Sequence, residues 1–166
     1  MKKNTKKTVI LFLCVLTIMT VIFLFSSQSG DDSGRLSEKV SRIISKIIFF
    51  NFDTMTVEKQ NFIVSELNSF VRKLAHFSVY TVLGMFVYMA VLTFGDIFKH
   101  KRTIALGLCA LYAAADEIHQ YFIPSRTMRL RDVIIDSTGS LFGIIIISVI
   151  VIVIEHLKAT YKKALI

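Results

Sequence analysis

Four apolar runs constrain the fold of this chain more than any other feature of its sequence. They cover residues 8–25, 74–94, 103–123 and 133–154. A helix needs roughly 17–25 residues to cross a bilayer, and each run has about that length. The sequence therefore predicts an all-α fold: a four-span transmembrane helical bundle that forms one membrane domain over residues 1–166.

Composition supports a membrane protein and argues against a nucleic-acid partner. Hydrophobic residues make up 54% of the 166 residues, which is too apolar for an ordinary soluble domain. The formal net charge of +8 lies largely beside the apolar runs, where positive charge usually sets membrane orientation. We therefore expect membrane lipids, and no nucleic acid, as partners. Cys14 and Cys109 lie inside apolar runs without metal-ligand spacing, and we interpret both as core thiols.

The insert between the first two runs, residues 35–70, has a different pattern. The preceding stretch SGDDSGR at 29–35 predicts a loop. An amphipathic helix follows, which either rests in the membrane interface or packs its apolar stripe on the bundle. The stretch NFDTMT at 51–56 breaks this helix, and a second helix from about Val57 runs into the second span. The apolar stripe consists of Val40, Ile43, Ile44, Ile47 and Ile48.

Orientation rests mainly on the lysines that precede the first run. With four spans, the termini and the loop at 95–102 share one side, and each side then holds ten Lys and Arg. Long loops count for less, and the leading Lys2, Lys3, Lys6 and Lys7 usually dominate. Ten of the twelve Asp and Glu lie on the other side, which corroborates the asymmetry. We expect a multi-pass protein with both termini in the cytoplasm.

Polar side chains gather at the outer ends of all four runs. A charged group near the middle of a bilayer costs about 2.5–3.5 kcal/mol on insertion scales, so a chain tolerates it where it faces other charges or a wet cavity. We predict a polar pocket that opens to the outside, with acids and arginines mutually compensated. Its members are Ser27, Gln28, Arg72, Lys73, His76, Tyr80, Asp116, Glu117, His119, Gln120, Arg126, Arg131, Asp132 and Asp136.

Four interpretations of these residues stay open. The charges can form an ion-pair lock that fixes helix register, as in a purely structural or regulatory protein. Two carboxylates and a histidine can perform acid–base chemistry, with Glu117, Asp116, His119 and His76 as the candidate catalytic residues. The arginines can bind the phosphate or carboxylate group of an anionic ligand. His76, His119 and Glu117 offer three metal ligands, but the nearby arginines repel cations, so we expect neither a metal nor a cofactor.

Under the anion-binding interpretation, three arginines contact the ligand: Arg72, Arg126 and Arg131. Asp132 and Asp136 hold these arginines in place. The other candidate ligand-binding residues are Ser27, Gln28, Lys73, Tyr80 and Gln120. Gly139 and Gly143 form a GxxxG motif in the fourth run, which predicts close helix packing.

Four ordered motifs resemble the VanZ-like family of bacterial membrane proteins. They are FSSQ at 25–28, RKLAHFSVYTVLG at 72–84, DEIHQYFIPSR at 116–126 and RDVIIDSTGSLFG at 131–143. The resemblance extends from about Val9 to Val153. It implies a multi-pass protein of the bacterial cell membrane that acts in the cell envelope, in a family associated with resistance to the glycopeptide teicoplanin. A lipid-linked cell-wall precursor or a glycopeptide is then the expected ligand.

Overall fold

A computed structural model describes residues 5–164, which fold entirely into helices and connections, with no strand in that range. The all-α prediction is confirmed for this part of the chain. Lys2 and Lys3, which contributed to the predicted orientation, lie outside the described residues. The elements are α1 (Thr5–Ser26), α2 (Gly30–Ile48), η1 (Phe52–Thr54), α3 (Val57–Leu92), η2 (Gly95–Ile97), α4 (Lys101–Tyr121) and α5 (Leu130–Ala164).

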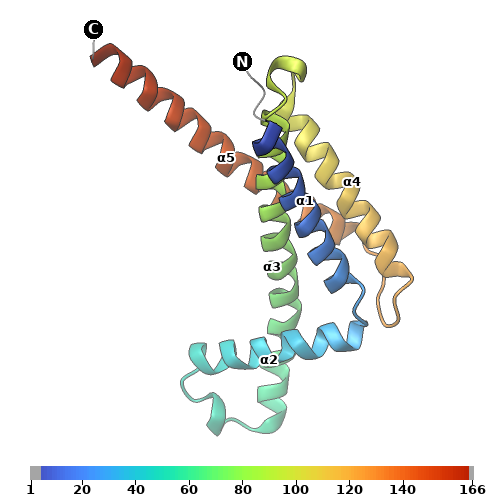
Figure 1. The fold of residues 1–166 in the computed structure, drawn as a ribbon. Helices are drawn as coiled ribbons and strands as arrows, with labels where there is room; N and C mark the ends of the chain where they lie inside the picture. Colours follow the sequence, from blue (N-terminus) through green and yellow to red (C-terminus); the bar gives the residue numbers. More distant parts are fainter. Residues whose placement is uncertain (1–4, 165–166) are drawn as a thin grey trace.

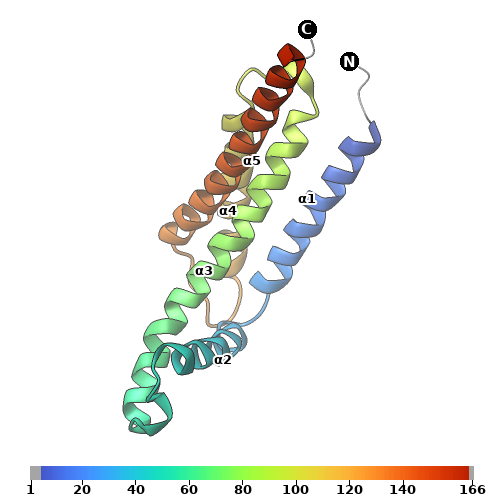
Figure 2. The same ribbon diagram turned by 90° about the vertical axis from the view of Figure 1, so that its left-hand side faces the viewer.

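Helix α3 is the centre of the fold and packs against the four other α-helices (Figures 1 and 2). Helices α1, α4 and α5 flank it, and α2 lies across one end of the bundle. The start of α1, the end of α5 and the α3–α4 connection lie at the opposite end. The last turns of α5 lean away from the other helices in Figure 1. The end marked by α2 also holds the loop between α4 and α5.

Within residues 5–164, three helices are long and apolar enough to cross a membrane: α1, α3 and α5. Helix α4, the predicted third span, has 21 residues but does not reach the same mean hydropathy. The reason is its polar last turns, where Asp116, Glu117, His119 and Gln120 follow a long apolar stretch. The apolar helices establish a membrane protein, whereas the count of four spans does not follow from length and composition alone.

The prediction of a loop at 29–35 is wrong, because α2 already begins at Gly30. Ser29 caps the helix: its hydroxyl oxygen accepts a hydrogen bond from the backbone N–H of Asp32 at 3.1 Å. The same hydroxyl donates to the Asp32 carboxylate at 2.7 Å. This hydrogen bond and the Arg35 side chain hold the pKa of Asp32 below its usual value. A serine followed three residues later by an acid is a capping signal, which outweighs the glycines of this stretch.

Helix α2 packs on α3 through small polar residues and leaves its apolar stripe uncovered. Ser37, Ser41 and Ser45 recur every four residues and are buried. On the stripe, Ile43 is 60% exposed and Ile47 is 78% exposed. The alternative in which this stripe packs on the bundle is therefore wrong. The serines form the packed face because their small side chains allow two helices to approach closely.

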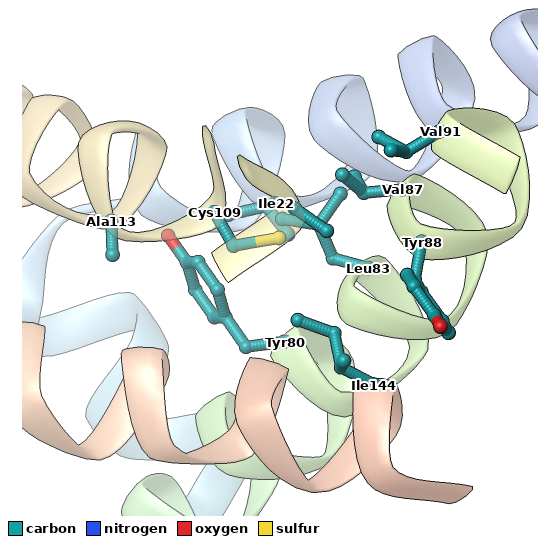
Figure 3. Close-up of a cluster of buried hydrophobic side chains, with 10 residues drawn as sticks. Ile22, Tyr80, Leu83, Val87, Tyr88, Val91, Cys109, Ala113 and Ile144 are labelled. Atoms are coloured by element: carbon teal, nitrogen blue, oxygen red, sulfur yellow. The ribbon is translucent and has the colours of Figure 1, made fainter. Parts of the chain in front are cut away.

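Helix α3 is continuous over 36 residues, as predicted for the run from Val57 into the second span. Its second half lies in the apolar core of the bundle, where Tyr80 and Leu83 are almost fully buried. Figure 3 shows Tyr80 reaching from α3 toward Ala113 of α4. On α4, the buried residues Ala105, Cys109 and Ala113 recur every four residues. This narrow face lets α4 approach α3 closely, and the same face continues into its polar end.

Three glycines bring the backbones of α3 and α5 into direct contact. A Cβ added to Gly143 would lie 2.0 Å from the carbonyl oxygen of Thr81, and one on Gly139 would lie 2.5 Å from that of Phe77. From the other helix, a Cβ on Gly84 would lie 2.2 Å from the Ser140 carbonyl oxygen. The GxxxG motif therefore performs the packing role predicted for it.

We expect Gly143→Ala to destabilise the protein by about 1–3 kcal/mol, because the added methyl group must push α5 away from the α3 backbone. Denaturation in detergent measures the effect. Gly107→Ala is the matched control, since no atom lies within 4 Å of a Cβ at that helical position. An equally stable Gly143→Ala variant would contradict the close contact.

Candidate functional site

The end of α1 is joined to the polar end of α4 by a buried hydrogen-bond network. Ser26 donates to Oδ2 of Asp116 at 2.8 Å, and Gln120 donates to the same oxygen at 3.0 Å. Gln120 also donates to the Ser26 hydroxyl at 3.2 Å. All three side chains are buried. The network continues the inward face of α4 that carries Ala113, so the buried carboxylate has fixed partners on two helices.

His119 occupies the seam between α1 and α4. Its Nε2 lies 3.1 Å from the Ser27 hydroxyl, and its ring stacks on Phe23 with centroids 4.5 Å apart. Neither His119 nor Ser27 lines the polar cavity described below. Their arrangement supports a packing role and separates His119 from the other candidate catalytic residues.

Glu117 and Arg126 hold the loop between α4 and α5. The carboxylate of Glu117 is buried and accepts a hydrogen bond from the backbone N–H of Arg129 at 2.9 Å. Arg126 donates to the backbone carbonyl oxygens of Gln28 and Phe25 at 2.9 and 3.0 Å. The loop is thereby tied to α4 on one side and to the end of α1 on the other.

The start of α2 closes on the same loop. The backbone N–H of Gly30 donates to the Pro124 carbonyl oxygen at 3.0 Å. A Cβ at Gly30 would lie 2.0 Å from the carbonyl oxygen of Ser125, so the contact requires glycine. Ser125 itself has a φ of 59° and donates to the Asp31 carboxylate at 3.2 Å. Helices α1, α2 and α4 thus jointly position the residue that follows, Arg126.

Across α3 and α5, the acid Asp136 faces a histidine. Nδ1 of His76 lies 3.6 Å from Oδ2 of Asp136, which is fully buried. The predicted pairing of site acids with arginines is not found in the part of the chain that the structure describes. Its arginine ion pairs lie on α2, at Arg35–Asp32 and Arg42–Glu38. Arg126 instead donates to backbone carbonyl groups, and the Arg129 side chain donates to the Thr127 hydroxyl.

A polar cavity of about 280 Å³ opens at this end of the bundle. Six of the predicted ligand-binding residues and two of the candidate catalytic residues line it: Arg72, Lys73, Gln120, Arg126, Asp132, Asp136, His76 and Glu117. Arg131 is exposed and does not line it, whereas Arg129 does. The sequence interpretation also missed Ser65, Asn68, Ser69, Ser125, Thr127 and Ile135.

The missed α3 residues had a recognisable signal. Ser65 and Ser69 precede Arg72 and His76 at helical spacing, so all four belong to one polar stripe. The missed loop residues had none, because only the folded connection between α4 and α5 brings them to the cavity.

A second, mainly apolar cavity of about 330 Å³ lies beside the first, between α1, α2 and α3. Leu36 and Val40 of α2 and Val71 and Val79 of α3 contribute to its wall. Gln28 and Tyr80, predicted as ligand-binding residues, line this cavity rather than the polar one. The two cavities share Arg72, His76 and Arg126.

Buried polar atoms without a hydrogen-bond partner concentrate around these cavities. In the described residues they are Asn68 Oδ1, Tyr80 Oη, Asp116 Oδ1, Arg126 Nη1, Asp136 Oδ1 and Asp136 Oδ2. Buried polar groups are normally paired, so these atoms are the ones in the described residues that can accept a water molecule, an ion or a ligand as a partner.

Comparison with known proteins gives the family. Residues 10–152 match the VanZ/LLP1 family. The chain belongs to the VanZ/LLP1 family. This confirms the resemblance drawn from the four motifs. No curated protein and no solved structure matches the chain.

Substitution of Glu117 tests how the loop is held. Because the Glu117 carboxylate accepts the Arg129 N–H, Glu117→Ala should loosen the loop and increase trypsin cleavage after Arg126, Arg129 and Arg131. Glu117→Gln keeps an acceptor oxygen of similar position and should stay resistant. Mass spectrometry of the fragments locates the cuts. Equal cleavage of both variants would contradict this role of Glu117.

Proposed function

We propose that this membrane protein binds an envelope lipid with an anionic headgroup. The observation that carries the proposal is the pair of adjoining cavities, one polar and lined by arginines, the other apolar, which share Arg72, His76 and Arg126. A ligand that fills both must carry a polar, anionic part next to an apolar chain. Lipid-linked phosphates have this chemistry.

The headgroup is held by cations from α3 and from the loop after α4. Nη1 of Arg126 is a buried donor without a partner in the described chain. Burial lowers the pKa of Arg126, and the nearby charge of Arg72 lowers it further. Two like charges facing one space favour an anion between them, and guanidinium groups suit phosphate oxygens. Lys73 and Arg129 add positive charge to the same wall.

The apolar chain of the lipid enters beneath α2. The exposed apolar stripe of α2, together with the membrane-crossing helices around it, is consistent with a helix that lies in the membrane interface. Leu36 and Val40 belong to the apolar cavity and to the exposed side of α2. We infer that an acyl or prenyl chain passes from the bilayer into the cavity along these two side chains.

We favour binding over catalysis because the four candidate catalytic groups do not converge on one opening. His119 lies in the α1–α4 seam, Glu117 holds the loop, and Asp116 bonds Ser26 and Gln120. The VanZ/LLP1 family is linked to teicoplanin resistance. This link favours a lipid-linked cell-wall precursor as the ligand. A glycopeptide remains the second candidate for the polar cavity.

We further propose that α4 is a fourth span and that the polar end faces outward. Helix α4 runs beside α1 and α3 between the two ends of the bundle (Figure 1). Its carboxylates are buried against neighbouring helices, which removes most of the cost of placing them at membrane depth. Both termini are then cytoplasmic.

Lipid titration followed by native mass spectrometry tests the headgroup site. The protein should retain phosphatidic acid in preference to phosphatidylcholine. Arg72→Ala should lower the affinity for phosphatidic acid about 10-fold, because a charge-assisted hydrogen bond contributes about 1.5–3 kcal/mol. Arg102→Ala, which removes the same charge at the opposite end of the bundle, should change little. If both variants lost the same affinity for phosphatidic acid, general surface charge would explain the binding, and a headgroup site at Arg72 would be contradicted.

Cysteine labelling tests the topology. In a Cys14→Ser, Cys109→Ala background, Thr127→Cys should react with an impermeant maleimide in intact cells. Lys99→Cys should react only after the cells are permeabilised. Labelling of both positions from the same side would contradict the crossing of α4. The reversed pattern would contradict the orientation.

A further inference from the structure

Two buried carboxylates and one half-buried histidine converge from three helices beside the polar cavity. His76 comes from α3, Asp116 from α4 and Asp136 from α5. One ligand atom from each lies within 4.8 Å of the other two. Asp116 is 4% exposed and Asp136 is fully buried. From this arrangement we propose that His76, Asp116 and Asp136 bind a divalent transition-metal ion such as Zn²⁺ or Mn²⁺.

The two carboxylates have no lysine or arginine as a counter-charge, and only Asp136 faces an imidazole. Both oxygens of Asp136 and Oδ1 of Asp116 are buried without a hydrogen-bond partner in the described chain. No lysine or arginine of that part of the chain lies within 4.0 Å of either carboxylate, and His76 makes the one ion-pair contact. An isolated buried carboxylate is strongly disfavoured, and a bound cation removes this penalty for both acids at once.

The positions of the ligand atoms suit a small cation. Two ligands at roughly 2.0–2.1 Å from a tetrahedral ion are separated by ~3.4 Å. The His76 Nδ1 to Asp136 Oδ2 distance of 3.6 Å is already close to that value. The ligand atom of Asp116 lies within 4.8 Å of those of His76 and Asp136, so the three must draw closer together to share one ion. The polar cavity, which His76 and Asp136 line, provides the entry path and room for a water or ligand atom in the open position.

The surroundings of Asp116 resemble the outer shell of a metal site. Its Oδ2 accepts hydrogen bonds from Ser26 and Gln120, which fix the carboxylate and leave Oδ1 available. Ligating carboxylates are commonly held by such hydrogen bonds, which orient the free oxygen toward the ion. Tyr80, one turn after His76 on α3, adds a buried hydroxyl group without a partner.

The nearby arginines do not prevent cation binding. Arg126 directs two of its nitrogens to the carbonyl oxygens of Gln28 and Phe25, which partly compensate its charge. Cations and arginines also occur together where an anionic phosphoryl group binds between them. The metal site rests on the triad alone and does not require the proposed lipid ligand.

The ligand set decides the class of metal. One imidazole nitrogen and two carboxylate oxygens suit Zn²⁺ or Mn²⁺, whereas Mg²⁺ and Ca²⁺ prefer oxygen ligands throughout. This set differs from the His76, His119 and Glu117 combination considered from the sequence. The structure commits His119 to Ser27 and Glu117 to Arg129.

Elemental analysis of the full chain, purified in mild detergent without a histidine tag or chelator, tests the site. We expect a stoichiometric amount of Zn or Mn that Asp136→Asn loses. Asp132→Asn should retain the metal, because Asp132 lines the same cavity four residues earlier on α5 but does not belong to the triad. Metal kept equally by both variants would overturn the assignment.

A second measurement covers the case in which Asp136→Asn fails to fold. The wild-type chain should lose thermal stability when a chelator removes the metal and regain it when Zn²⁺ or Mn²⁺ is added, but not when Mg²⁺ is added. The proposal would be overturned if the wild-type chain held no metal and its melting temperature did not change on addition of Zn²⁺ or Mn²⁺. Neither measurement uses lipid. The outcome for the metal site is therefore independent of the outcome of the phosphatidic acid experiment.

Discussion

The structure depends on how a helical bundle holds carboxylates away from water. Asp116, Glu117 and Asp136 are all buried, and each carboxylate faces a different kind of partner. Side chains of α1 and α4 bond Asp116, a loop backbone N–H bonds Glu117, and Asp136 faces His76. Charges are tolerated at membrane depth when they face one another or a cavity rather than lipid. The elements at this end of the protein are arranged around that requirement.

The close crossing of α3 and α5 makes the central part of this arrangement possible. Gly139 lies against the backbone of Phe77, one residue after His76 on α3. Asp136 lies one turn before Gly139, so the contact that needs a glycine also brings the acid to the imidazole. Without this approach, the His76 and Asp136 side chains would not reach each other. On these two helices, the packing residues therefore also position the candidate site residues.

The α4–α5 loop also both packs against other helices and positions a residue of the candidate site. It is tied to α1 through Arg126, to α4 through Glu117 and to α2 through Gly30. These contacts place the guanidinium group of Arg126 where the polar and apolar cavities meet. A loop held from three sides keeps this group preorganised, which reduces the ordering cost when a ligand binds. This geometry supports the proposed binding of an amphiphilic molecule by this VanZ/LLP1 protein.

Hydropathy and short motifs determined the helical class, the membrane setting, the family and most of the residues at the polar end. These features are local, since apolar length, helical spacing and ordered motifs are all written in the chain itself. The prediction placed a loop where α2 begins, because the glycines around Ser29 were given more weight than its capping signal. Only the tertiary structure decided which acid meets which partner: Asp136 faces His76 instead of an arginine, and Arg129 rather than Arg131 reaches the cavity. Helix rotation and loop path set these pairings, and both depend on contacts between segments that are distant in the sequence.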